Sequence, residues 1–406
     1  MLFSKNLLLL CLPFSLLFTA CSKDDDQPTP QPQPQPEPVV TVPAVELDHI
    51  KTPTTLEDRN SDPNVIDYFA NKSIAVSAEL TIKPGVVIGF AEDTRLDINS
   101  GGVISAIGTS DKKIRFVGKT AQKGFWSGIM IYSNASANNF THTEILHAGS
   151  ANMIDGKKMA IALFGLARVS VSNTTISQSG GWGIFLRDNA ILVNFAANNF
   201  SNNHEAPLLI SANHVASLDE ATAYTGSNGR NVVEVISSSI TGASEVTWPS
   251  FADNTPIRFL GTVDARTGWK LKPGTIIEVA EDKQINIETG GYLNAVGTAA
   301  KKITITGVEK STGSWTGLVV YTGSALNELN HVKLQCAGGA TMLGGIKAAI
   351  PLFGTTPTNL VVRNSEISFS GGYGIHVFGK KASLNADVET SNTFINNLQG
   401  NVFYDL

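Results

Sequence analysis

The chain contains one long stretch of sequence twice. The segment IKPGVVIGFAEDTRLDINSGGVISAIGT, from Ile82 to Thr109, returns as LKPGTIIEVAEDKQINIETGGYLNAVGT from Leu271 to Thr298. Matches at this spacing, with one small shift of register, extend the duplicated unit over about residues 54–203 and 246–397. Repetition is typical of solenoids, in which each coil is too small to form a core and is stabilised by the coils stacked on it.

Within each copy the apolar residues occur in short runs that predict strands. LTI, VVIGF, LDI, VISAI, IRFVG, GIMIY and GIFL are rich in Val, Ile and Phe and are separated by Gly, Asn, Asp and Ser. A weak helical pattern occurs at TTLEDRN, residues 54–60, and is expected to cap the N-terminal end. A chain of β-sandwiches or a solenoid could use these strands. Uneven turn spacing and asparagines at strand ends favour the solenoid, because asparagine tolerates left-handed backbone and can form ladders between coils.

The segments LTIKPGVVIGF, GGVISAIGT, KKIRFVG, WSGIMIY and NTTISQSGGWGIF resemble the right-handed parallel β-helix proteins found among Bacteroidetes surface lipoproteins. The resemblance covers the chain from about residue 54 to its end. It implies an all-β fold, a right-handed parallel β-helix (solenoid) formed by internal duplication. Coils of about 22 residues, each adding about 4.8 Å, would give some sixteen coils and a rod of roughly 75 Å. Polysaccharide lyases and polygalacturonase-type hydrolases share this fold, but a fold does not transfer an activity.

The N-terminal segment predicts export and membrane anchoring. Lys5 and the apolar run that follows it have the pattern of a secretory signal, and the run is too short to span a bilayer. The sequence FTAC, ending at Cys21, resembles a bacterial lipobox, which implies lipidation of Cys21. The acidic SKDDD that follows is similar to the surface-export tag of Bacteroidetes lipoproteins. We therefore expect a lipoprotein anchored at Cys21 in the outer membrane and exposed at the cell surface.

Proline at every second position of QPTPQPQPQPEP predicts an extended tether after the anchor. The expected domains are a signal peptide (1–20), a flexible acidic and Pro-rich tether (21–45), the first β-helix copy with its cap (46–203), connecting coils (204–245) and the second copy (246–406). Only Cys336 remains in the folded part, so no internal disulfide is expected. A net charge of -5 without a basic stripe argues against a nucleic-acid partner.

Comparison of the copies separates structural residues from candidate sites. A residue present in both copies is read as structural, whereas a catalytic residue should occur in only one. Two acidic pairs recur and are read as solvated turns, with a calcium-binding corner as the alternative: Glu92, Asp93, Glu281 and Asp282. No other cofactor is expected.

Few polar residues are unique to one copy. Four are weak catalytic candidates, with decoration of a strand face as the ordinary explanation: Asp97, Glu144, His147 and Asp188. A lyase needs a cation and a base, and a hydrolase needs paired carboxylates. The dense acidic and basic patterns of β-helix enzymes are missing, so the sequence leans against catalysis. A polysaccharide lyase or glycoside hydrolase remains the alternative.

Aromatic residues near glycines are the candidate ligand-binding groups. Sugar rings stack on exposed aromatic faces, and two sites on one polymer raise avidity. The alternative is that the rings cover apolar edges of coils; the residues concerned are Trp126, Trp182, Trp315 and Tyr373. The sequence predicts non-catalytic binding of extracellular carbohydrate or host surface material. An enzyme, and a structural stalk or protein-binding adhesin, are the other hypotheses.

Overall fold

The computed structural model describes residues 41–187 and 189–406, which lie in one compact unit. The predicted signal peptide, Cys21 and most of the tether lie outside the described residues. The unit begins at Thr41, and Val45 already pairs with Tyr68. Residues 41–45, which the sequence assigned to the tether, therefore belong to the folded part. No helix among the described residues is long and apolar enough to cross a membrane.

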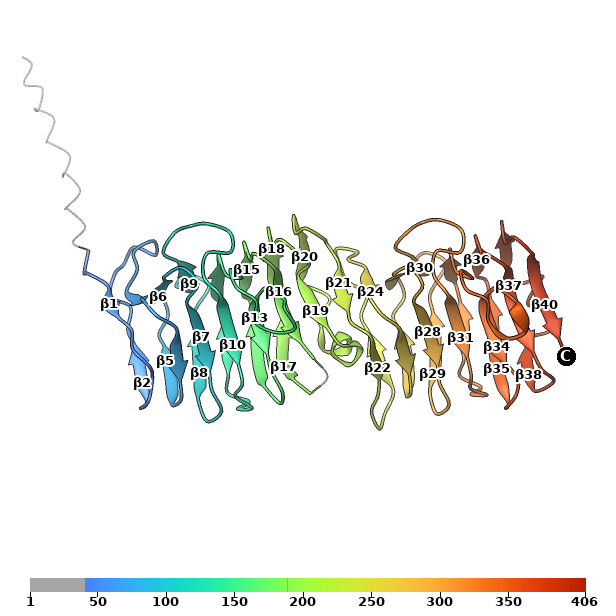
Figure 1. Cartoon of the computed structure of the whole chain (residues 1–406), viewed down its shortest axis with the longest axis horizontal. Coiled ribbons are helices and arrows are strands. Elements are labelled where there is room, and N and C mark those ends of the chain that lie inside the picture. Colours follow the sequence, from blue (N-terminus) through green and yellow to red (C-terminus); the bar gives the residue numbers. More distant parts are fainter. Residues whose placement is uncertain (1–40, 188) are drawn as a thin grey trace, which may run out of the picture. The chain divides into compact units, whose positions relative to one another are not determined.

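The unit is a parallel β-helix, as the sequence predicted (Figure 1). Successive strands turn from one sheet to the next, and every pairing between strands is parallel, as in β3–β6 and β6–β9. We name the five sheets A to E. Sheet A contains β1 (Val45–Glu46), β3 (Tyr68–Ala70), β6 (Val87–Phe90), β9 (Ile114–Gly118), β12 (Thr143–Leu146), β15 (Thr175–Ser177), β18 (Asn199–Ser201) and β20 (Ala223–Gly226).

Sheet B is the longest and runs through both copies. It contains β4 (Ile74–Val76), β7 (Arg95–Ile98), β10 (Gly128–Ile131), β13 (Met159–Leu163), β16 (Trp182–Leu186), β19 (Leu208–Ile210), β21 (Val233–Val235), β24 (Ile257–Phe259), β27 (Ile276–Val279), β30 (Ile303–Gly307), β33 (Val332–Gln335), β36 (Glu366–Ser368) and β39 (Thr393–Ile395). Sheet C contains β2 (Thr54–Leu56), β5 (Glu79–Ile82), β8 (Val103–Ile107), β11 (Asn139–Thr141), β14 (Arg168–Ser172) and β17 (Ile191–Ala196).

The remaining two sheets belong to the second half of the unit. Sheet D contains β22 (Ser238–Ile240), β25 (Val263–Ala265), β28 (Gln284–Ile287), β31 (Gly317–Val320), β34 (Ala348–Phe353), β37 (Tyr373–Phe378) and β40 (Gly400–Asp405). Sheet E contains β23 (Val246–Trp248), β26 (Gly268–Leu271), β29 (Tyr292–Val296), β32 (Glu328–Asn330), β35 (Thr358–Arg363) and β38 (Ala382–Leu384). Two short 3₁₀ helices, η1 (Ala212–Ser217) and η2 (Leu343–Gly345), interrupt the strands.

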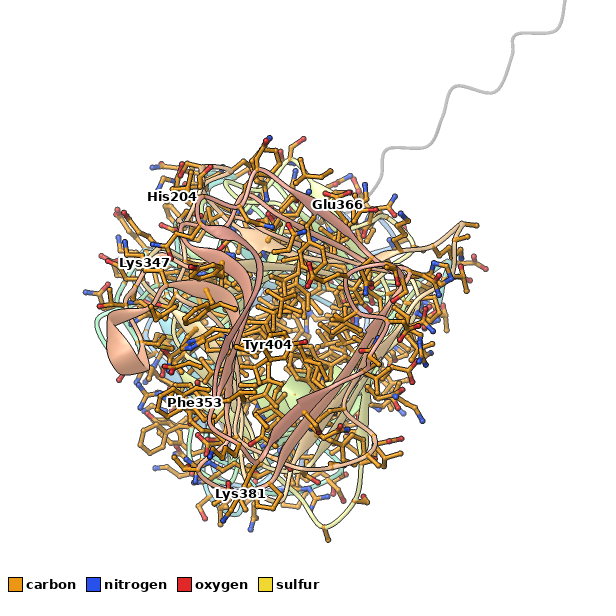
Figure 2. All side chains as sticks on the ribbon, turned by 90° about the vertical axis from the view of Figure 1, so that its right-hand side faces the viewer. His204, Lys347, Phe353, Glu366, Lys381 and Tyr404 are labelled. Carbon is orange, nitrogen blue, oxygen red and sulfur yellow. The ribbon has the colours of Figure 1, made fainter. Side chains whose placement is uncertain are left out.

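The core lies inside the sheets and is built from stacked apolar side chains (Figure 2). Strand residues alternate between the two faces of a sheet, so identical registers place equivalent side chains directly above one another. In sheet A one such inward ladder is fully buried and consists of Ile88, Phe116, Ile145, Ile176 and Phe200. Burial of these ladders supplies the stability that the single remaining cysteine cannot.

Asparagines at the corners behave as the sequence predicted. Asn173, Asn202 and Asn364 have φ angles of 49°, 55° and 51° in the left-handed region. Next to this corner, Asn203 is buried and forms a ladder with the coil above, because its side-chain nitrogen donates to Asn228 Oδ1 at 2.9 Å. The asparagine ladder is therefore confirmed.

Two expectations from the sequence are wrong. TTLEDRN is not helical, because Thr54–Leu56 forms β2 and pairs with Leu80–Ile82. β-Branched threonines fit a pleated surface better than a helix. The coils are also longer than about 22 residues: thirteen strands are stacked in sheet B, and at about 4.8 Å per strand they span roughly 60 Å rather than 75 Å. Loops such as residues 119–127 and 147–158 account for the additional length of each coil.

The two copies occupy the solenoid one sheet position out of step. KKIRFVG forms β9 in sheet A, whereas its counterpart KKITITG forms β30 in sheet B. Likewise β10 lies in sheet B and its counterpart β31 lies in sheet D. The 3₁₀ helix η1 packs between β17, the last strand of sheet C, and β22, the first strand of sheet D. The predicted connecting coils thus continue the solenoid and shift its register.

Candidate functional site

Trp126 and Trp315 do not form a ligand platform. Both side chains are fully buried, and their indole N–H groups donate to the carbonyl oxygens of Leu146 and Gln335, each at 2.8 Å. Trp126 also stacks on Phe90, with ring centroids 4.0 Å apart. The prediction of exposed rings at these two positions is wrong, because both rings fill the interior of a coil.

Trp182 lies at the surface and is held by a buried charge. Its indole Nε1 donates to Glu234 Oε2 at 2.7 Å, and the Glu234 side chain is only 1% exposed. Glu234 Oε1 accepts a second hydrogen bond, from Arg230 Nε at 2.6 Å, and the Arg230 guanidinium lies over the indole ring, 5.9 Å from its centroid. Arg230 also pairs with Glu205. This network fixes the orientation of a half-buried aromatic ring.

The ring of Trp182 lines a surface cavity of about 400 Å³. The cavity is also lined by Lys158, His204 and Glu205, so charged and hydrogen-bonding groups surround the indole. We call this cavity the Trp182 site. An oriented aromatic ring beside polar groups can hold a sugar ring by stacking and by hydrogen bonds to its hydroxyls.

The glycines beside Trp182 and Tyr373 lie where neighbouring coils are in close contact. A Cβ atom at Gly181 would lie 1.8 Å from the Lys158 carbonyl oxygen, which is closer than any side chain permits. Gly372, beside Tyr373, is in the same position, 1.9 Å from the Lys347 carbonyl oxygen. These glycines therefore allow the backbones of adjacent coils to approach each other closely.

Tyr373, the counterpart of Trp182, is half-buried and stacks on Phe403 with ring centroids 4.8 Å apart. One face of its ring is thus occupied by a neighbouring coil. The copies therefore do not present two equivalent aromatic platforms, and Trp182 is the predicted ligand-binding residue with the more specific surroundings.

Of the catalytic candidates that the structure describes, the two carboxylates lie on different sheets. Asp97 lies on β7 of sheet B and accepts two hydrogen bonds from Arg95, at 2.6 and 3.1 Å. Glu144 lies on β12 of sheet A and pairs with Lys113 and Arg115, at 3.1 and 3.0 Å. The two carboxylates thus belong to different sheets, and each is neutralised by its own basic partners. Asp188 lies outside the described residues.

His147 has a structural position at the end of β12. Its φ of 65° matches the 64° of its counterpart Cys336, so both residues turn the same left-handed corner. Its carbonyl oxygen accepts hydrogen bonds from the backbone N–H groups of Phe125 and Trp126, at 2.6 and 3.2 Å. Burial, assisted by the positive charge of Arg115, lowers the pKa of His147, so the side chain is neutral at pH 7.

The recurring acidic pairs lie in exposed turns. Asp93 and Asp282 have identical φ angles of 57°, a left-handed conformation that aspartate tolerates. Their neighbours Glu92 and Glu281 are exposed. Within residues 41–187 and 189–406, no three acidic, histidine or cysteine side chains are grouped in a way that could hold a metal ion.

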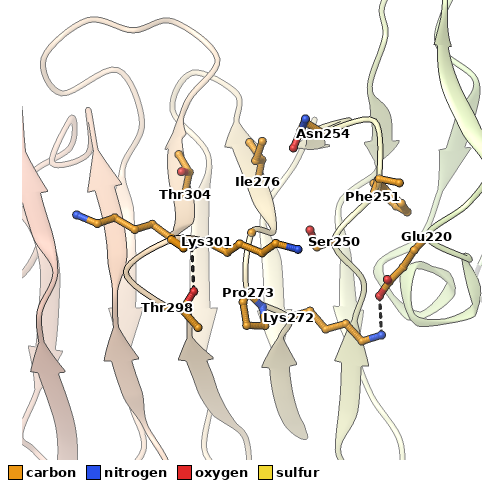
Figure 3. A pocket seen from close by; sticks show the side chains of 14 residues that line it. Glu220, Ser250, Phe251, Asn254, Lys272, Pro273, Ile276, Thr298, Lys301 and Thr304 are labelled. Carbon is orange, nitrogen blue, oxygen red and sulfur yellow. Dashed lines mark hydrogen bonds and ion pairs between the residues drawn. The ribbon is translucent and has the colours of Figure 1, made fainter.

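A pair of equivalent grooves follows the Pro-Gly turns. The first-copy groove, about 370 Å³, is lined by residues that include Asp58, Gly85, Lys112, Arg115 and Glu144. The second-copy groove, about 760 Å³, is lined by Glu220, Ser250, Phe251, Asn254, Lys272, Lys301, Lys302 and Thr304, among others (Figure 3). The copies therefore share a hollow but line it differently.

Sequence reasoning missed Glu234 and Arg230. Both lie in the connecting coils, outside the part of the chain in which the two copies could be compared. A signal was present nonetheless: NVVEVI, residues 231–236, places an acidic residue within an apolar strand. Because a carboxylate is buried only with partners, this pattern predicts a basic or hydrogen-bonding group close by.

Comparison of the chain with protein-family models, with curated proteins and with solved structures finds no match.

Proposed function

We propose that this protein is a surface-anchored lipoprotein that binds extracellular polysaccharide, or glycans of a host surface, without catalysis. The observation that carries the proposal is the Trp182 site, where a buried Glu234 and the guanidinium of Arg230 fix a half-buried indole ring that lines a surface cavity. Prior fixing of the ring lowers the entropy lost when a sugar stacks on it. A rigid solenoid is also suited to contact an extended polymer along its length.

The proposed location rests on the N-terminal sequence. The lipobox-like FTAC would place the lipid on Cys21, and the acidic and Pro-rich segment after it would hold the β-helix away from the membrane. The resemblance to Bacteroidetes surface lipoproteins supports an outer-membrane position facing outward. A protein in this position would be in direct contact with extracellular polysaccharide. Labelling with radioactive palmitate, compared between the natural chain and Cys21→Ser, tests the anchor.

Replacement of Trp182 by alanine is expected to weaken binding of a polysaccharide ligand by tenfold or more. A tenfold loss corresponds to about 1.4 kcal/mol, which is within the range for a central aromatic contact. Ligands would be found by affinity electrophoresis of the purified chain through gels containing plant, algal and host polysaccharides, and the dissociation constant would then be measured by calorimetry.

Two further variants make this experiment specific. Trp182→Phe keeps the stacking surface but loses the indole N–H, and is expected to retain part of the affinity. Tyr404→Ala removes an aromatic ring that is 49% exposed on the last strand and should bind as the natural chain does. If Trp182→Ala bound every ligand with unchanged affinity, the Trp182 site would not be the binding site.

The enzymatic alternative predicts a different result. Asp97 and Glu144 are each engaged by arginine or lysine, and they lie on different sheets, so neither forms a carboxylate pair with the other. We expect no new reducing ends when the protein is incubated with the same polysaccharides in the presence of calcium. Reducing ends that appeared, and that were lost in Asp97→Asn, Glu144→Gln or His147→Ala, would establish a lyase or hydrolase instead.

A further inference from the structure

The two equivalent grooves differ in their balance of charge. In the first-copy groove three acidic side chains face three basic ones: Asp58, Asp111 and Glu144 against Lys112, Lys113 and Arg115. Lys112 pairs with Asp58 at 2.9 Å, and Glu144 pairs with Lys113 at 3.1 Å and with Arg115 at 3.0 Å. The basic groups of the first copy are therefore neutralised within the protein.

The second copy keeps two of these lysines and lacks all three acids. Lys301 and Lys302 correspond to Lys112 and Lys113, but Asp58, Asp111 and Glu144 are replaced by Ser250, Ala300 and Lys333. The one acidic residue lining the second-copy groove, Glu220, pairs with Lys272 at 2.6 Å (Figure 3). Across the part of the chain that the structure describes, no ion pair involves Lys301, Lys302 or Lys333.

Lys333 adds a third positive charge next to the groove. It lies on β33, where it is in register with Thr304 of β30, one of the residues that line the groove. Its counterpart Glu144 is the residue that neutralises Lys113 and Arg115 in the first copy. Glu366 of β36 is in register with Lys333, but the hydrogen bonds of its carboxylate are to Gln335 and Ser368. Replacement of an acid by a lysine makes this side of the groove more positive than in the first copy, and an excess of positive charge concentrates anions.

The second-copy groove is also larger, and it lacks the arginine that crosses the first-copy groove. In the first copy the guanidinium of Arg115 reaches across the groove and donates to Pro63 O and, at 3.4 Å, to Asn64 Oδ1. Threonine replaces this arginine at position 304, and the groove has about 760 Å³ in place of about 370 Å³. The second copy therefore combines free positive charge with room for a ligand.

The groove also offers groups that suit a sugar. The hydroxyls of Ser250 and Thr304 and the amide of Asn254 line it, and none of these side chains forms a hydrogen bond within the described residues (Figure 3). Pro273 and Ile276 contribute apolar surface beside them. Lysines alone would suit any anion, whereas neutral donors and apolar carbon next to lysines suit a sugar that carries a charged substituent.

We infer that the second-copy groove binds the carboxylate or sulfate groups of an acidic polysaccharide, with Lys301 and Lys302 as the direct partners and Lys333 as a neighbouring source of positive charge. The inference rests on the proposed function and specifies the class of polysaccharide that the protein binds. The Trp182 site and the second-copy groove are separate. The first would contact a sugar ring by stacking, and the second would pair with its charged substituents. One chain can thus engage an acidic polymer at two places, which raises the overall affinity.

The test measures binding of three polymers to the purified full chain by calorimetry: polygalacturonate for carboxylates, dextran sulfate for sulfates and neutral dextran as the uncharged probe. We expect one or both acidic polymers to bind at least tenfold more tightly than dextran. Their affinity should fall several-fold between 0.05 and 0.3 M NaCl, because the Debye length shortens from roughly 14 Å to roughly 6 Å.

The duplication supplies matched variants. Lys301→Gln with Lys302→Gln should weaken binding of the acidic polymer at least tenfold, whereas Lys112→Gln with Lys113→Gln, the equivalent change in the neutralised groove, should change it less than twofold. Ser250→Asp with Lys333→Glu introduces two of the first-copy acids at their equivalent positions and should weaken binding as much as loss of the lysines. Circular dichroism melting curves identify any variant that does not fold.

The outcomes distinguish this inference from the proposed function. An equal loss of affinity in both double lysine variants would mean that positive charge acts from the whole surface. It would overturn the inference that the second-copy groove is the binding site. Unchanged binding in Lys301→Gln with Lys302→Gln, together with a loss in Trp182→Ala, would overturn the groove and leave the proposed function standing. Absence of binding to any polysaccharide would overturn both. Binding of single-stranded DNA as tight as that of the acidic polysaccharides would reassign the groove to polyanions in general.

Discussion

Replacement of Trp126 by alanine is expected to lower the free energy of unfolding by about 3–5 kcal/mol, the range for truncation of a fully buried tryptophan. The ring is completely buried, stacks on Phe90 at 4.0 Å and donates its N–H to the Leu146 carbonyl oxygen at 2.8 Å. Truncation leaves a cavity and removes the hydrogen bond from the indole to the Leu146 carbonyl group. The midpoint of urea denaturation, followed by circular dichroism and by fluorescence, measures the effect.

The duplicated chain provides the controls for this variant. Trp315→Ala should cost a similar amount, because that ring is equally buried and makes the equivalent hydrogen bond to Gln335 O at 2.8 Å. Tyr404→Ala, at an exposed position, should change the free energy of unfolding by less than about 0.5 kcal/mol. A loss below about 1 kcal/mol in Trp126→Ala would contradict the buried position and revive the surface role predicted from the sequence.

Replacement of Glu234 by leucine should reduce polysaccharide affinity as much as loss of Trp182 itself. The buried carboxylate holds both the indole N–H, at 2.7 Å, and the Arg230 guanidinium, at 2.6 Å, so its removal frees the ring and leaves two donors without their partner. We also expect the free energy of unfolding to fall by about 1–3 kcal/mol, the cost of unsatisfied donors, and towards the lower end because Arg230 can be hydrated. Calorimetric titration and urea denaturation measure the two effects separately.

Glu234→Gln separates orientation from charge. Glutamine keeps an oxygen that can accept the indole hydrogen bond but loses the negative charge that pairs with Arg230. If the orientation of the Trp182 ring determines binding, the polysaccharide affinity of Glu234→Gln should fall less than that of Glu234→Leu. Undiminished affinity in Glu234→Leu, measured well below its melting temperature, would show that the fixed ring of Trp182 does not determine binding.

The fold could be predicted from the sequence because the features that determine it are local. Alternating Val, Ile and Phe specify strands, and Asn173 or Asn202 at the strand ends specifies left-handed corners. The length of a coil was underestimated because residues in loops such as 119–127 do not alter the strand pattern. The step of one sheet between the copies also has no local sequence signal, since it follows from the position in the solenoid at which the second copy begins.

The candidate sites were harder to predict because exposure depends on packing between coils. Trp126 and Trp182 both stand next to small residues in the sequence, yet one ring points into the core and the other lines a surface cavity. Comparison of the copies singled out Glu144 as unique, and in the structure its carboxylate pairs with Lys113 and Arg115. The comparison of the copies is therefore most informative about charge, because Lys301 and Lys302 lack the acidic partners of Lys112 and Lys113.

The step of one sheet between the copies also bears on how such a chain can grow. If a new copy had to keep each strand in the sheet of its parent, only duplications that span whole coils would fold. Here β9 and its counterpart β30 lie in different sheets, and both halves still stack on the common sheet B. What a coil requires from its neighbour is a matching cross-section and a row of backbone hydrogen-bonding groups, whatever the sequence history of the strand that supplies them. A duplicated segment can thus enter the stack in a different sheet from its parent, provided that connecting coils such as those of residues 204–245 continue the solenoid.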